Sequence, residues 1–111
     1  MRQQRLKLTI LIICLFLIGL VGATSADVTV PTLFSDHAVL QRDMPVPVWG
    51  TASPGESVTV EFNGQSKTTM TDGSGNWMVF LDQMDASSNP GDMVITGNNV
   101  ITRTGMQVGE V

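Results

Sequence analysis

Apolar residues between positions 27 and 111 come in short runs, several of which alternate with polar residues. In VTVEF, for example, Val58, Val60 and Phe62 fall on one face of an extended chain, with polar residues on the other. Proline and glycine interrupt the chain so often that no apolar run at helical spacing is long enough for a helix. We therefore predict strands at Val28 to Leu33, Val39 to Leu40, Val46 to Gly50, Ser57 to Phe62, Ser66 to Thr71, Trp77 to Leu81, Met93 to Thr96, Asn99 to Arg103 and Met106 to Val108. Short strands separated by turn signals predict an all-β fold, a small antiparallel β-sandwich of the immunoglobulin-like or jelly-roll-like kind.

The Asn-Gly pair at positions 63 and 64 is a strong hairpin signal between two of these strands. A two-residue loop would place Val60 opposite Lys67 on the same face, which conflicts with burying Val60. We therefore predict a longer, bulged loop that pairs Val60 with Ser66 and keeps the lysine outside.

The loop TDGSGNW offers side-chain oxygen atoms from Asp72, Ser74 and Asn76 at alternate positions, a spacing that also occurs in calcium loops. Trp77 stands where such a loop needs glycine, and Gln83 stands where it needs a closing glutamate. We therefore interpret the loop as a plain hairpin turn, and we expect no metal and no cofactor.

The strand WMVFL is apolar on both faces, with Trp77, Val79 and Leu81 on one and Met78 and Phe80 on the other. A strand of a free two-layer sandwich is expected to show water one polar face. Either loops of this domain cover Met78 and Phe80, which is the interpretation we favour from the strand alone, or another domain covers them.

The first residues of the chain have the pattern of a secretory signal peptide. Basic residues come first, an uncharged apolar stretch runs from Leu8 to Gly22, and the small residues of ATSA follow. We predict a signal peptide over residues 1–26 with cleavage after Ala26, and Ser25 as the second choice. The alternative is an uncleaved anchor, although the apolar stretch is shorter than the roughly 20 residues that span a bilayer.

Residues 27–111 form the predicted mature domain and carry three basic and ten acidic residues, a formal charge of −7. So acidic a surface repels phosphate backbones, which excludes nucleic acid as a partner. The only cysteine, Cys14, lies inside the predicted signal peptide and not at its cleavage site, which argues against a lipoprotein. The exported domain must therefore be held by its core and not by disulfides.

Ser35, Asp36 and His37 are adjacent and are the three residue types of a serine hydrolase triad. In an extended segment Ser35 and His37 share a side while Asp36 points away, whereas a triad needs the histidine between the other two. We therefore expect no catalytic residue here, and instead a turn in which Ser35 and Asp36 accept hydrogen bonds from amides just downstream.

Other signatures of an active site are absent from the sequence, including a Gly-x-Ser-x-Gly elbow and clustered histidines or cysteines. Trp49 and Trp77 could together form a platform for stacking sugars. Because their neighbours are apolar, we favour a buried pair in the sandwich core.

From Asp27 onward the chain resembles the N-terminal region of bacterial sialate O-acetylesterases. The resemblance is carried by LFSDHAVLQRDMPVPVWG, by TDGSGNWMVFL and by the closing VGEV. It implies that a small β-sandwich precedes an α/β domain of the SGNH-hydrolase type, which removes O-acetyl groups from sialic acids or related sugars. Gly109, Glu110 and Val111 match the start of the family's Gly-Glu-Val-Trp stretch, which comes shortly before its Gly-Gln-Ser-Asn motif.

The match ends before that motif, so the nucleophile and its histidine and aspartate correspond to no position here. We therefore expect residues 27–111 to be the non-catalytic accessory module of an exported esterase, periplasmic or extracellular, with the catalytic domain as its partner. The catalytic domain would act on an acetylated sugar, and no membrane span would remain after signal cleavage. The alternative is a free-standing secreted sandwich that binds carbohydrate or mediates adhesion.

Overall fold

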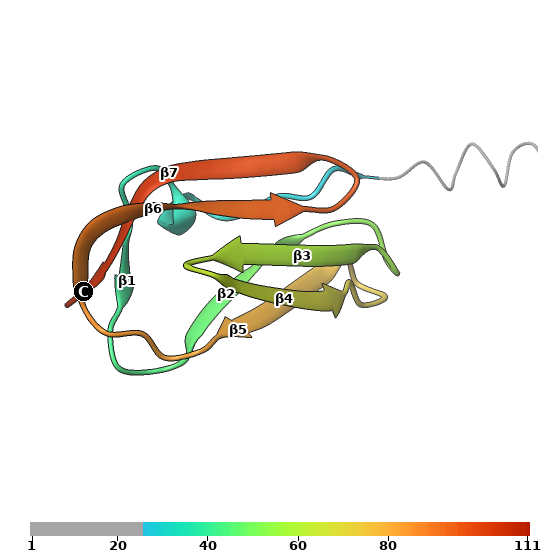
Figure 1. The fold of residues 1–111 in the computed structure, drawn as a ribbon. Helices are drawn as coiled ribbons and strands as arrows, with labels where there is room; N and C mark the ends of the chain where they lie inside the picture. The colour runs from blue at the N-terminus through green and yellow to red at the C-terminus, as the bar shows by residue number, and fades with distance from the viewer. Residues whose placement is uncertain (1–25) are drawn as a thin grey trace, which may run out of the picture.

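The computed structural model describes residues 26–111, and strands make up most of this part of the chain (Figure 1). The elements are the 3-10 helix η1 (Thr32–Phe34) and the strands β1 (Val39–Gln41), β2 (Val46–Thr51), β3 (Ser57–Phe62), β4 (Gln65–Met70), β5 (Asn76–Leu81), β6 (Ser87–Thr96) and β7 (Val100–Gly109). The predicted all-β class is confirmed.

Two sheets form the sandwich. One has the order β1-β7-β6-β3-β4 and the other consists of β2 and β5. Figure 1 shows β7, β6, β3 and β4 side by side, with the long strands β6 and β7 curling toward β1 at one end. All neighbouring strands are antiparallel except β1 and β7, which run parallel with Leu40 opposite Val108. The sandwich was predicted from the sequence, whereas this parallel pair was not.

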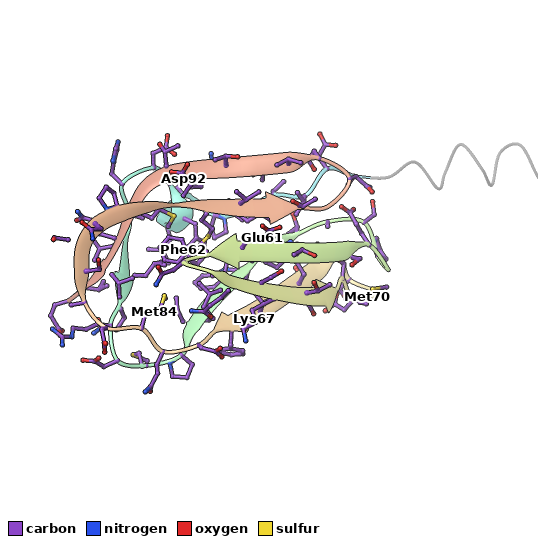
Figure 2. The ribbon with its side chains drawn as sticks, in the orientation of Figure 1. Glu61, Phe62, Lys67, Met70, Met84 and Asp92 are labelled. Atoms are coloured by element: carbon purple, nitrogen blue, oxygen red, sulfur yellow. The ribbon has the colours of Figure 1, made fainter. Side chains whose placement is uncertain are left out.

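The core lies between the sheets and comes from the alternation described above. In β5, Trp77, Val79 and Leu81 are buried, and in β3 the same holds for Val58 and Val60. The other buried apolar residues are Val28, Phe34, Leu40, Val46, Val48, Ala52, Phe62, Met84, Met93, Ile95, Met106 and Val108. Figure 2 labels Phe62 and Met84 among them. One contiguous core therefore holds the domain together.

The β3–β4 hairpin has a two-residue loop, so the predicted bulged loop is wrong. Val60 pairs with Lys67, and both loop residues have positive φ, 52° at Asn63 and 78° at Gly64. Lys67, which Figure 2 labels, is tolerated on the inner face because β4 is an edge strand, where its ammonium reaches the Asp82 carboxylate at 3.1 Å. The stem of a lysine can cover an edge without burying its charge.

Three other segments differ from the predicted strands. Residues 28–33 contribute only an isolated bridge between Thr29 and Thr51, because the chain then turns into η1. The predicted strands at residues 99–103 and 106–108 are one strand, β7, which passes through Gly105 at a φ of 66°. β6 begins at Ser87, earlier than predicted, and its pairing with β7 shifts register twice before Met93.

The predicted signal peptide lies outside the described residues except for Ala26. Within residues 26–111, no helix is long and apolar enough to span a membrane.

Candidate functional site

The segment from Ser35 to His37 is a turn that is fastened to β7. The carboxylate of Asp36 accepts a hydrogen bond from the amide of Thr104 at 2.8 Å, and the amide of His37 donates to the Thr104 carbonyl at 2.8 Å. His37 has a φ of 64°, and its ring lies directly over Gly105, where a β-carbon would overlap it. The predicted turn is present, but Asp36 bonds to a distant strand and not to an amide just downstream.

This arrangement gives the three residues a structural use. The Asp36 carboxylate already accepts from a backbone amide, and the backbone of Ser35 accepts from Ala38 at 3.2 Å. A catalytic aspartate would instead have to accept a hydrogen bond from the His37 ring. That the segment is not catalytic remains our prediction.

Replacing Asp36 with alanine is expected to lower the free energy of unfolding by about 1 kcal/mol, because the Thr104 amide loses its acceptor. The Asp36→Asn variant is the matched control, since its amide oxygen can still accept that hydrogen bond. Urea denaturation of both variants tests this expectation. Equal losses for Ala and Asn would show that the carboxylate charge matters and the hydrogen bond does not.

The Asp72 loop is closed by its own backbone. One carboxylate oxygen of Asp72 accepts hydrogen bonds from the amides of Ser74 and Asn76, each at 2.9 Å, and Gly75 has a φ of 84°. These contacts form an Asx-type turn, in agreement with the hairpin turn predicted here from the sequence. Among residues 26–111, no three acidic, histidine or cysteine side chains gather as metal ligands.

Calcium is therefore expected to leave the stability of the chain unchanged. We predict that the melting temperature is the same in about 5 mM calcium as in EDTA. This concentration is roughly saturating for weak extracellular calcium sites. Differential scanning calorimetry measures both. An increase with calcium that Asp72→Asn abolishes would contradict the interpretation of this loop as a plain turn.

The two tryptophans lie on opposite faces of the β2–β5 sheet. Trp77 is buried opposite Gly50, whereas Trp49 is half-buried opposite Met78 on the outer face. The ring of Trp49 meets the ring of Phe34 edge to face at a centroid distance of 4.9 Å. The favoured buried pair is therefore wrong, and a joint stacking platform is excluded by the same geometry.

The outer side of β2 and β5 is apolar and uncovered by the described residues. Trp49 and Pro47 pair there with Met78 and Phe80, and these last two are 48% and 57% exposed. We call these four residues the apolar face. Coverage of Met78 and Phe80 by loops of this domain, which the strand alone favoured, is wrong.

A groove of about 400 Å³ continues the apolar face toward the end of the chain. Its lining residues are Leu33, Phe34, Val39, Leu40, Gln41, Val46, Pro47, Trp49 and Val111. It has no charged side chain and only one polar one, so it suits an apolar surface and not a polar ligand. The sequence pointed to Met78 and Phe80 but not to this groove, because η1, β1 and Val111 come together only in the fold.

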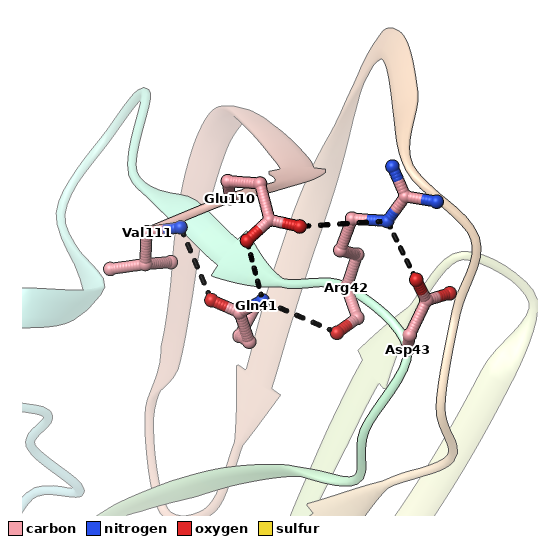
Figure 3. A network of polar contacts seen from close by, with 5 residues as sticks. All are labelled: Gln41, Arg42, Asp43, Glu110 and Val111. Carbon is pink, nitrogen blue, oxygen red and sulfur yellow. Dashed lines mark hydrogen bonds and ion pairs between the residues drawn. The ribbon is translucent and has the colours of Figure 1, made fainter.

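A polar network fixes the chain where it leaves β7 (Figure 3). The side chain of Gln41 accepts from the Val111 amide at 3.2 Å and donates to Glu110 at 3.3 Å. Arg42 pairs with Asp43 at 2.7 Å and approaches Glu110 at 3.9 Å. The hydrogen bond to Asp43 raises the pKa of the Arg42 guanidinium above its ordinary value. Because these groups are exposed, the network sets the direction of the chain more than its stability.

Comparisons with known proteins gave two informative structures. No family model matches the chain, and no curated protein matches it significantly. A carbohydrate acetylesterase from Xanthomonas citri is similar with a TM-score of 0.72 and 37% identity, over 75% of this chain and 19% of that chain. A Ca²⁺-stabilized adhesin that helps an Antarctic bacterium reach out and bind ice is similar with a TM-score of 0.52 and 31% identity.

The adhesin match covers 80% of this chain and 25% of the adhesin chain. The chain thus spans a small part of both proteins. The similarities support two classes of function, a module of a carbohydrate esterase or an adhesin-like β-domain.

Proposed function

We propose that residues 27–111 are the non-catalytic N-terminal module of an exported carbohydrate O-acetylesterase whose substrates are O-acetylated sialic acids or related sugars. The observation that carries the proposal is the 37% identity to a carbohydrate acetylesterase over 75% of this chain, in a match that takes up 19% of that protein. The geometry of the Asp36 turn agrees, since its polar groups are used in holding β7. The export of the module rests on the predicted signal peptide over residues 1–26.

In the proposed parent protein the chemistry belongs to the domain that follows. A serine there attacks the acetyl carbonyl, a histidine takes and returns the proton, and backbone amides stabilise the oxyanion. The hydroxyl of the sugar leaves first, and water then releases acetate from the acyl-enzyme. The module described here contributes no reacting group to these steps.

The DNA that follows codon 111 is the first test of the proposal. It is expected to encode a tryptophan soon followed by Gly-Gln-Ser, in frame with Val111. A reading frame that stops at codon 111, or continues without that motif, would overturn the assignment.

The activity of the full-length product is the second test. It is expected to release acetate from an acetylated sialoside, whereas the chain ending at Val111 releases none. His37→Ala in the full-length protein is expected to retain the rate, because the ring of His37 lies against Gly105 and its amide is bonded to Thr104, which is a structural use. Loss of the rate in a folded His37→Ala protein would reinstate the Ser35 to His37 segment as a candidate active site.

The second candidate function is a secreted sandwich that binds carbohydrate or mediates adhesion, which the adhesin match favours. Trp49 is the useful reporter because it is partly exposed, whereas Trp77 is only 3% exposed. Titration with sialylated glycans would give a saturable fluorescence change that Trp49→Phe removes. A flat titration would count against this candidate and leave the esterase module unaffected.

A further inference from the structure

We infer that the apolar face and its groove are the surface on which the catalytic domain of the same polypeptide docks. This inference rests on the proposed function and adds where the two domains meet. It follows from exposure, from charge and from the place where the chain leaves the sandwich.

Exposed apolar side chains gather in this region. Six of the eight large exposed apolar side chains of residues 26–111 belong to this region, namely Leu33, Val39, Met70, Met78, Phe80 and Val111. Met70, which Figure 2 labels, joins the region through a second hollow that is also lined by Trp49 and Met78. Large contiguous apolar patches of this kind mark interaction surfaces on soluble domains.

Charge selects the kind of partner. The apolar face and the groove contain no charged side chain, and the second hollow has a single one, Asp72, on a domain whose formal charge is −7. Two copies that met through this face would bring two such charges together, and that repulsion opposes a dimer. A neutral or basic domain surface meets no such opposition.

The position of Val111 favours a domain of the same polypeptide as the partner of this surface. Val111 lines the groove, and Gln41 holds its amide there (Figure 3). A domain attached directly after Val111 therefore starts at the groove. The short connection gives it a high effective concentration at the apolar face, which a separate protein lacks.

Methionine oxidation tests the inference, because Met78 and Met44 are each 48% exposed and only Met78 lies on the apolar face. In the chain ending at Val111, hydrogen peroxide is expected to oxidise both methionines at comparable rates. Peptide mass spectrometry measures the oxidation of each. In the full-length gene product we expect Met78 to oxidise roughly tenfold more slowly than Met44, because oxidation follows exposure.

Two variants of the full-length protein provide the controls. Phe80→Ser removes an exposed side chain from the apolar face and is expected to restore much of the oxidation of Met78. Val100→Ser removes a comparably exposed side chain from the start of β7 and is expected to leave Met78 protected. Because both side chains are exposed, both variants should fold, which the fluorescence of buried Trp77 checks.

The outcomes separate this inference from the proposed function. Equal oxidation of Met78 and Met44 in a full-length protein that releases acetate would overturn the docking and keep the esterase. A reading frame that ends at codon 111 would overturn both. Protection of Met78 in the short chain that grows with protein concentration would assign the apolar face to a second copy and overturn the proposed occupant.

Discussion

Replacing Trp77 with alanine is expected to lower the free energy of unfolding by about 4 kcal/mol. The indole is 3% exposed and lies at the start of the inner face of β5, opposite Gly50 of β2. Its Nε1 donates to the carbonyl of Thr51 at 3.2 Å, so the substitution also removes one of the two hydrogen bonds that this carbonyl accepts, the other coming from the Thr29 amide at 2.8 Å. The surrounding side chains can fill only part of the cavity that the indole leaves. The expected loss in the free energy of unfolding is a large share of the stability of a small domain.

Urea denaturation followed by the fluorescence of Trp49 measures this loss, since Trp49 remains after the substitution. Trp77→Phe is the matched control, because it keeps most of the buried area while it loses the hydrogen bond and a part of the indole. We expect it to cost about 1.5 kcal/mol. If the two variants were equally unstable, the packing of the indole would not be its main contribution.

Replacing Gly50 with alanine is expected to cost about 3 kcal/mol, although the change adds a single methyl group. A β-carbon at this position would overlap the carbonyl oxygen of Thr29 and would lie 2.9 Å from Cζ2 of Trp77. The Thr29 carbonyl accepts a hydrogen bond from Thr51 at 3.2 Å, so moving it breaks the bridge that ties the N-terminal segment to β2. There is therefore no room for a side chain at position 50.

A double-mutant cycle identifies which neighbour causes the cost. In a Trp77→Phe background the loss caused by Gly50→Ala is expected to persist, because the closer obstacle is backbone and not the indole. Gly73→Ala is the control, with no atom near its added β-carbon, and should change stability by less than about 0.5 kcal/mol. A loss that disappears with Trp77→Phe would assign the cost to the ring instead of Thr29.

The alternation of side chains was enough to place most strands and the inner face of β5. It failed where a tertiary contact decides the outcome. Lys67 faces inward because an acceptor, Asp82, happens to lie beside the edge strand. Trp49 and Trp77 are separated by the register of β2 and β5, which no local pattern in the sequence specifies.

The candidate docking surface was partly predictable for a related reason. Met78 and Phe80 violate the expected polar face of a strand, and a violation of this kind can be seen in the sequence. The groove beside them is made by η1 and β1 together with Val111, which lies at the other end of the described residues. Such a site appears only once the fold brings its parts together.

The parallel pair of β1 and β7 has a consequence for the order of events during synthesis. β1 finds its partner only in residues 107–109, and Arg42 donates to the Gly109 carbonyl across the same junction. The first strand of the sandwich therefore stays unpaired until almost the whole module has left the ribosome. Contacts over such long separations slow folding and leave the partly made chain exposed to proteases and to aggregation.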